Sequence, residues 1–353
     1  MAKNIVVFSD GTGQEGGNGF NTNIYKLFNM IEDRTAEQVA FYDAGLGTGW
    51  NKLSGMIGGA GMSRNIQECY RFIFDHYEAG DNIFLFGFSR GAATVRSLSS
   101  FIHYFGILPK SRPELIKKAY AIYRIGDAEK RKQAADDFVS RHRTMWTRIR
   151  FLGCYDTVAA LGLPSKTASA FLDGLPGFRH KFHDFRLSES VETACHALAI
   201  DDERKTFHPI PWENQVLDYQ VIKQVWFCGV HTDVGGGYKK QGLAGIPLVW
   251  MTRHAVDKGL KIYNGHKVLI KEAADGHMHD SREGIASVYR KKQRQWDAAR
   301  LGKPVVHESV LQRKLNQDNK ESPVYRPWIL DMDHDVEPWL RHEQQPWFVD
   351  NKP

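Results

Sequence analysis

The chain has 353 residues, of which 42% are hydrophobic and 25% are charged, and its formal net charge is +6. This composition is that of an ordinary soluble globular protein, and the length suffices for one large α/β domain. No apolar run approaches the roughly 18 to 20 residues of a membrane span. The N-terminal residues 1–8 have too short an apolar part for a secretory signal and no cleavage site of small residues. We therefore expect synthesis and folding in the cytoplasm, with export by a signal-independent route left open.

The positive charge is concentrated in two stretches, 130–150 and 291–300. Their helical spacing and interleaved acidic residues favour solvated helix faces, while a surface for anionic membranes or polyphosphate is the alternative. Signatures of nucleic-acid modules are absent, so we expect no nucleic-acid partner. The oligomeric state is not indicated.

The cysteines are few and far apart, and none forms a CxxC pair. We expect buried free thiols, with neither a disulfide framework nor a metal site. They are Cys69, Cys154, Cys195 and Cys228.

Apolar, β-rich runs alternate with helical patterns along the first two thirds of the chain. Because strands that read as continuous apolar runs and alternate with helices imply a parallel sheet covered on both faces, we predict an α/β fold with a mainly parallel sheet. In chain order the predicted elements are strand 4–8, helix 23–31, strand 38–42, helix 64–78, strand 82–86, helix 92–105, strand 148–155 and strand 224–230.

Three segments interrupt or extend this alternation. Residues 107–147 are helical and charged, and residues 164–187 are rich in glycine, proline and aromatic residues; we predict that both are cap-like insertions. Residues 265–353 have a weak strand signal and many tryptophans, which indicates an extension packed on the same core. We therefore predict a single domain over 1–353.

The turn after the third strand carries the strongest chemical signal. It reads Gly87-Phe88-Ser89-Arg90-Gly91, between a buried strand and a helix. Glycines two before and two after a serine leave room for a strained turn that lifts the hydroxyl from the sheet edge for use as a nucleophile. The alternative is a tight strand–helix turn whose serine has no catalytic role.

A nucleophilic serine needs a base and a carboxylate that orients the base. Asp156 and His231 follow the next two predicted strands and give the chain order serine, aspartate, histidine that is typical of α/β-hydrolases. We favour this pair, while Asp233 with His307 stays open as the alternative. Each residue could instead have a structural role only: Asp156 could cap a helix, His231 could be a core histidine, and Asp233 could be a turn residue.

Backbone amides must also stabilise the oxyanion of an acyl-transfer reaction. The amide of Arg90 directly follows the nucleophile, and the second donor is expected from the loop Asp10-Gly11-Thr12, through Gly11 or Thr12. Asp10 is a further candidate site residue of this loop. The glycines could alternatively cradle a phosphate, although the lysine and spacing of a P-loop are missing.

Together the turns resemble one family. The motifs are Ser9-Asp10-Gly11-Thr12, Tyr42 to Thr48, the Ser89 turn, Tyr155-Asp156-Thr157-Val158 and His231-Thr232-Asp233-Val234-Gly235-Gly236-Gly237-Tyr238, and the likeness runs from about residue 3 to 313. They resemble the α/β-hydrolase family that includes the type VI secretion phospholipase effectors. The resemblance implies an α/β-hydrolase fold, ester hydrolysis, and a triad of Ser89, Asp156 and His231.

The predicted function is that of a serine hydrolase of the lipase or phospholipase type, acting through an acyl-enzyme without metal or organic cofactor. Its expected partner is a lipid or small-molecule ester, with peripheral membrane contact. An esterase or thioesterase acting on a soluble substrate is one alternative. A non-catalytic binding module on a hydrolase scaffold is another.

Overall fold

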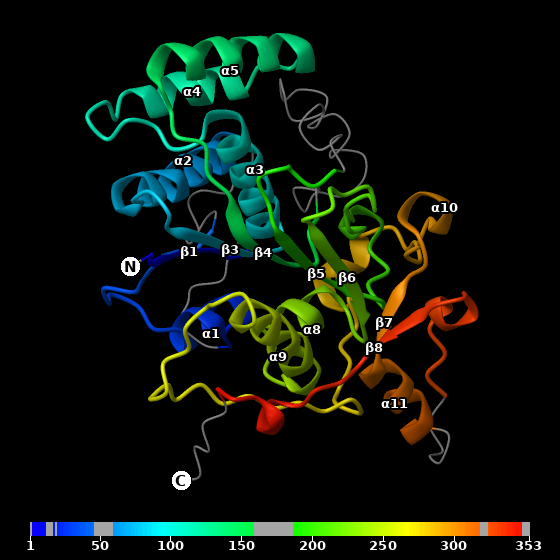
Figure 1. The fold of residues 1–353 in the computed structure, drawn as a ribbon. Helices are drawn as coiled ribbons and strands as arrows, with labels where there is room; N and C mark the ends of the chain where they lie inside the picture. The colour runs from blue at the N-terminus through cyan, green and yellow to red at the C-terminus, as the bar shows by residue number, and fades with distance from the viewer. Residues whose placement is uncertain are drawn as a thin grey trace.

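The computed structural model of the chain describes residues 2–11, 17, 20–45, 59–158, 186–317 and 324–347. Its centre is an eight-stranded sheet in the order β2-β1-β3-β4-β5-β6-β7-β8, and all neighbouring strands are parallel (Figure 1). The strands are β1 (Asn4–Ser9), β2 (Gln38–Asp43), β3 (Asn82–Phe88), β4 (Ile149–Tyr155), β5 (Thr193–Ala199), β6 (Val221–Phe227), β7 (Val305–His307) and β8 (Asp335–Glu337). The predicted α/β fold with a parallel sheet is confirmed.

Helices cover both faces of the sheet. In Figure 1, α2 and α3 lie above it, and α1, α8 and α9 lie below it. The helices are α1 (Asn23–Met30), α2 (Gly59–His76), α3 (Arg90–Phe105), α4 (Leu115–Tyr123), α5 (Ala128–His142), α8 (His231–Gly235), α9 (Gly242–Val256), α10 (Ala298–Leu301) and α11 (Glu308–Gln317).

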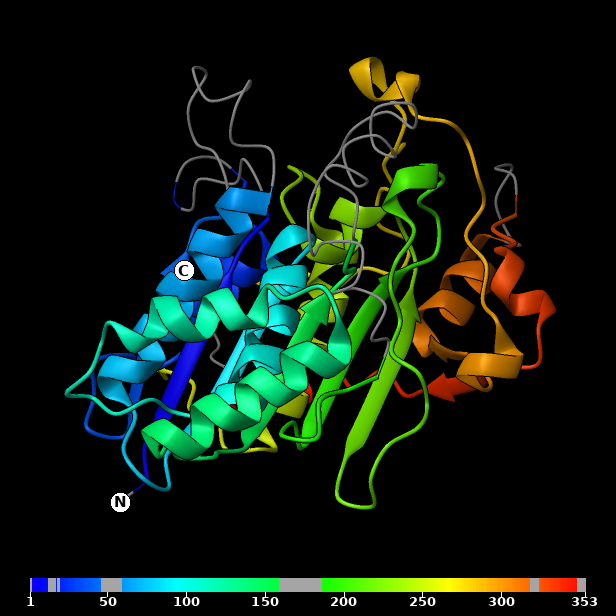
Figure 2. The ribbon, with the colours of Figure 1, turned by 90° about the horizontal axis from the view of Figure 1, so that it is seen from above.

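The period-two alternation of strand side chains divides the core between these two layers. On β1, Ile5 and Val7 pack with residues of α2 and α3, whereas Val6 and Phe8 pack with residues of α1 and α9. All four side chains are fully buried. As expected for a parallel sheet, both faces are apolar, and the polar chemistry is left to the strand ends. Figure 2 shows the strand arrows pointing toward one edge, which is where those ends lie.

The sheet holds more strands than the five predicted ones. β5 was missed because its sequence, TACHALA, is rich in alanine and has one β-branched residue, whereas β-branched and aromatic residues favour strands. Its Cys195, Ala197 and Ala199 pack in the core cluster that holds residues of α9. The predicted strand 224–230 begins and ends three residues earlier, as β6. The C-terminal extension, where little strand signal was found, adds β7 and β8 to the edge of the sheet.

The segment 107–147 forms α4 and α5, which pack against α2 and α3 as an outer layer on that side of the sheet (Figure 1). Asp127 caps α5 by accepting a hydrogen bond from the amide of Lys130. The insertion predicted over 164–187 lies outside the described residues except for 186–187. The cap roles and the single-domain boundary stay predictions.

The state of the cysteines and the apolar character of the helices follow from the described part of the chain. All four cysteines are buried and free, as predicted. No helix in the described ranges combines the length and the apolar character that a membrane crossing requires.

Candidate active site

The turn between β3 and α3 holds Ser89 in a strained conformation, with φ of 57° and ψ of −119°. The flanking glycines are required by close backbone approaches. A Cβ on Gly87 would lie 2.5 Å from the carbonyl oxygen of Gly91, and a Cβ on Gly91 would overlap the backbone of Ser9. The fold therefore accepts a left-handed residue at the apex, and strain of this kind clusters at functional sites.

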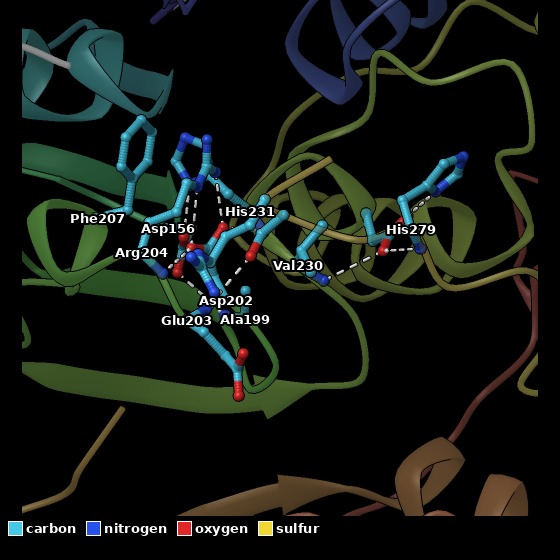
Figure 3. Close-up of polar contacts among 12 residues, drawn as sticks. Asp156, Ala199, Asp202, Glu203, Arg204, Phe207, Val230, His231 and His279 are labelled. Carbon is cyan, nitrogen blue, oxygen red and sulfur yellow. Dashed lines mark hydrogen bonds and ion pairs between the residues drawn. The ribbon is translucent and has the colours of Figure 1, made fainter. Parts of the chain in front are cut away.

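His231 contacts Ser89 across the carboxyl edge of the sheet. His231 is the first residue of α8, which follows β6, and its Nε2 lies 2.8 Å from the Ser89 Oγ. Its Nδ1 lies 2.5 Å from Oδ2 of Asp156, the residue directly after β4 (Figure 3). When Nδ1 donates to the carboxylate, Nε2 is free to accept the serine proton. Three residues that are distant in the sequence thus form one hydrogen-bonded chain.

Asp156 is fully buried and is held from several directions. Its Oδ1 accepts a hydrogen bond from the amide of Ala199 at 3.0 Å, and its own φ is 39°. The guanidinium of Arg294 donates to both carboxylate oxygens, from Nη1 to Oδ1 at 2.6 Å and from Nη2 to Oδ2 at 2.8 Å. Burial alone would raise the pKa of Asp156, but the charge and hydrogen bonds of Arg294 outweigh it and hold that pKa well below its usual range.

Arg294 is the residue of this cluster that the sequence analysis missed. It lies in the basic stretch 291–300, where solvated helix faces were predicted, yet it is only 1% exposed and precedes the short helix α10. Its remaining hydrogen bonds go to the carbonyl oxygens of Ala199 and Phe207. The expectation of a solvated face is therefore wrong at this position, because a buried carboxylate needs a buried cation.

Aromatic rings enclose the His231 imidazole on two sides. The ring of Phe88, next to the nucleophile, lies 4.7 Å away between centroids, and that of Phe207 lies 5.3 Å away edge-on. Gly235, in the glycine run after His231, packs so tightly against the Phe88 ring that a Cβ would overlap it. The backbone amide of His231 donates to Asp202 at 3.2 Å. These contacts fix the orientation of the imidazole, which is only 4% exposed.

The loop after β1 lies beside the nucleophile. A Cβ on Gly11 would be 3.7 Å from the Cβ of Ser89. The amide of Gly11 donates to the carboxylate of Asp10 at 2.7 Å, so the structure gives this proposed oxyanion donor another partner. Thr12, the other predicted donor, lies outside the described residues. The amide of Arg90, as the first residue of α3, has no intrahelical acceptor.

Asp10 is a buried anchor for this loop. Its Oδ2 accepts hydrogen bonds from the hydroxyls of Thr22, at 2.5 Å, and Tyr42, at 2.7 Å. Burial raises the pKa of Asp10 to about 6, against the opposing effect of these hydrogen bonds. The carboxyl group therefore ties α1 and β2 to the loop that passes Ser89.

The alternative pair, Asp233 with His307, is not brought to Ser89. Asp233 accepts a hydrogen bond from the Nδ1 of His279 at 2.6 Å, and Figure 3 shows His279 on the far side of Val230 from His231. His307 stacks on Phe227 and contacts the hydroxyl of Ser309 at 2.9 Å. Burial lowers the pKa of His307 to about 3, as expected for a neutral core histidine.

The side chain of Arg90, the residue after the nucleophile, places a cation near this region. It is half-buried and has no ion pair or hydrogen bond with any other described residue. Burial lowers its pKa to about 10, against an opposing electrostatic effect of Tyr289, whose ring packs edge-on against Phe207. A cation therefore lies at the rim that carries Phe207 and His231.

A family model described as T6SS, phospholipase effector Tle1-like, catalytic domain, matches residues 3–254. An uncharacterized protein of Saccharomyces cerevisiae is 29% identical over 231 residues, which cover 58% of this chain and 32% of the yeast protein.

Two solved structures are similar at low identity. An uncharacterized protein from Pseudomonas aeruginosa aligns with a TM-score of 0.48 and 16% identity over 78% of this chain and 49% of its own. The Tle1 effector bound to the VgrG spike of the type 6 secretion system aligns with a TM-score of 0.38 and 19% identity, over 68% of this chain and 52% of that one. The chain thus spans less than two thirds of the length of each of these relatives.

Proposed function

The chain belongs to the catalytic-domain family of Tle1-like phospholipase effectors of type VI secretion, and from this premise we propose that it is a serine hydrolase that cleaves carboxylic esters of phospholipids. One observation carries the proposal. The Ser89 hydroxyl, at the apex of a strained turn, lies 2.8 Å from an imidazole whose other nitrogen lies 2.5 Å from a buried carboxylate. This is the arrangement that nucleophilic acyl transfer requires.

The proposed reaction has two halves. His231 takes the proton of Ser89 as its oxygen attacks the acyl carbonyl, and the ionised Asp156 stabilises the imidazolium that forms. The amide of Arg90, with a second amide from the loop that follows Gly11, stabilises the oxyanion. His231 then protonates the leaving alcohol, and water, deprotonated by the same imidazole, hydrolyses the acyl-enzyme.

The Arg90 side chain supports an anionic substrate. A half-buried guanidinium beside the nucleophile, with no carboxylate partner among the described residues, can bind a phosphate through bidentate hydrogen bonds. A phospholipid carries its phosphodiester a few bonds from the scissile acyl ester. A neutral soluble ester would leave this desolvated cation without a partner.

The test is a substrate comparison on the purified chain. Release of fatty acid from phosphatidylglycerol and phosphatidylcholine vesicles is measured beside hydrolysis of short p-nitrophenyl esters and a soluble acyl thioester. We expect phospholipid turnover that falls by several orders of magnitude in Ser89→Ala. Turnover of the soluble esters alone would replace the phospholipase proposal by the soluble esterase alternative. No turnover of any of them would leave the binding-module alternative.

A further inference from the structure

A cavity lies beside the loops of the candidate active site. It has a volume of about 540 Å³ and is bounded by α1, by Gln241 at the N-terminal end of α9 and by residues 267–269. Both α1 and α9 follow loops from the carboxyl edge of the sheet, after β1 and β6 respectively. The catalytic chemistry proposed above does not use this cavity.

Lys26, on α1, lines this cavity with its ammonium-bearing side chain. The side chain is only 9% exposed, and the described part of the chain provides neither an ion pair nor a hydrogen bond for its Nζ. Burial lowers its pKa to about 8. A largely buried lysine whose ammonium group has no partner among the described residues and faces a cavity is suited to a negatively charged ligand from outside the chain.

The rest of the described lining is polar or cationic and carries no negative charge. Lys267 supplies a second ammonium group, and the side-chain amide of Gln241 has no hydrogen bond within the described residues. Asn21 accepts from the amide of Gly17 through its Oδ1, which leaves its Nδ2 to donate. No carboxylate appears among the described residues that line the cavity. Two cations, amide donors and no carboxylate among the described lining residues match an anion.

We infer that this cavity is a binding site for a phosphate group, held by Lys26 and Lys267 and by the amides of Gln241 and Asn21. Phosphate is favoured over a carboxylate because a monoester carries between one and two negative charges and three acceptor oxygens, which two ammonium groups and several amides can satisfy. The volume is sufficient for a phosphate with a glycerol-sized substituent.

The cavity is tied to both loops of the candidate active site. Thr22, the N-cap of α1, donates to Asp10 on the loop beside Ser89. Asn23 donates to the carbonyl oxygens of Val234 and Ala244, which lie in the segment that follows His231. A phosphate bound at Lys26 would therefore stabilise α1 in contact with the loop beside Ser89 and the segment after His231.

The experiment measures phosphate binding and does not depend on hydrolysis. Ser89→Ala protein is titrated with inorganic phosphate and glycerol 3-phosphate by calorimetry, and its sedimentation with phosphatidic acid and phosphatidylcholine vesicles is measured. Lys26→Met keeps the aliphatic stem and removes the charge, and we expect it to weaken phosphate binding by about ten-fold or more. Lys267→Met should weaken it by less, because that side chain is exposed.

Lys258→Met is the matched control, because it removes one partly exposed lysine just beyond the C-terminal end of α9, away from the cavity. Binding of soluble phosphates that depends on Lys26 identifies a free phosphate ligand, and binding of phosphatidic acid vesicles that depends on Lys26 identifies a lipid headgroup. Absence of both, or equal binding by Lys26→Met and Lys258→Met in a folded protein, overturns the inference. Thermal unfolding of each variant establishes that it is folded.

Discussion

Arg294 offers the sharpest test of how the candidate active site is held together. Its guanidinium makes two hydrogen bonds to Asp156 and two to backbone carbonyl oxygens, and both partners of the ion pair are essentially inaccessible to solvent. In Arg294→Met the carboxylate would stay buried with only His231 and the amide of Ala199 to stabilise its charge. Removing one partner of such a pair costs about 3–5 kcal/mol, and we expect that loss in the free energy of unfolding, measured by urea denaturation.

The same change should reduce turnover through the position of Asp156. Loss of two of the bonds that orient the carboxylate allows His231 to shift, and a displacement of about 1 Å in a catalytic group costs on the order of 100-fold in rate. We expect kcat to fall by about that factor while KM is unchanged, because Arg294 is too deeply buried to meet substrate. Arg294→Lys should recover part of the stability but little of the turnover, since a point charge cannot bind both oxygens.

A double-mutant cycle separates positioning from general structural damage. In an Asp156→Asn background the charge that Arg294 compensates is gone, so Arg294→Met should cost much less than it does alone. We expect a coupling free energy of about 2–3 kcal/mol, within the range found for contacting residues. Additive effects, or a normal kcat in Arg294→Met, would refute the reasoning.

Further predictions concern the neighbours of the site. Arg90→Gln keeps the backbone amide, so we expect it to reduce turnover of phospholipid vesicles by about ten-fold or more and to spare p-nitrophenyl esters, as kinetics on both substrates would show. Asp10 has a pKa raised from 3.8 to about 6, so its contribution to stability is complete below pH 4 and is lost as the pH rises through 6. The free energy of unfolding should fall by about 3 kcal/mol over this range. Urea titrations at several pH values should show this loss in the wild type and not in Asp10→Asn. His307→Gln should keep activity within a few-fold, whereas His231→Gln should lose at least 1,000-fold in an esterase assay.

Much of the site was predictable because strand ends are marked in the sequence. Each of Ser89, Asp156 and His231 follows an apolar run, and parallel strands carry their carboxyl ends to one edge, where the structure brings the three into contact. The family resemblance expected from the motifs is confirmed by the match over residues 3–254. The catalytic role of the three residues stays a prediction.

Other features had no local signal. Arg294 lies 138 residues beyond Asp156 among other basic residues, and only the folded chain shows which of them is buried. β5 has a single β-branched residue, Thr193, and is built mainly of alanine and cysteine in the middle of the sheet, where all its residues are buried. The glycine-rich loop after β1 suggested free amides, but the Asp10 carboxylate takes up that of Gly11, a competition that composition does not reveal.

The central claim is that an imidazole activates the Ser89 oxygen, and covalent labelling tests it most directly. The folded protein is incubated with a fluorophosphonate probe, and the modified residue and the rate of modification are determined by mass spectrometry. Our account predicts a single adduct on Ser89 in the wild type and labelling at least 100-fold slower in His231→Gln. An unmodified Ser89, or equal rates in the two proteins, would contradict it.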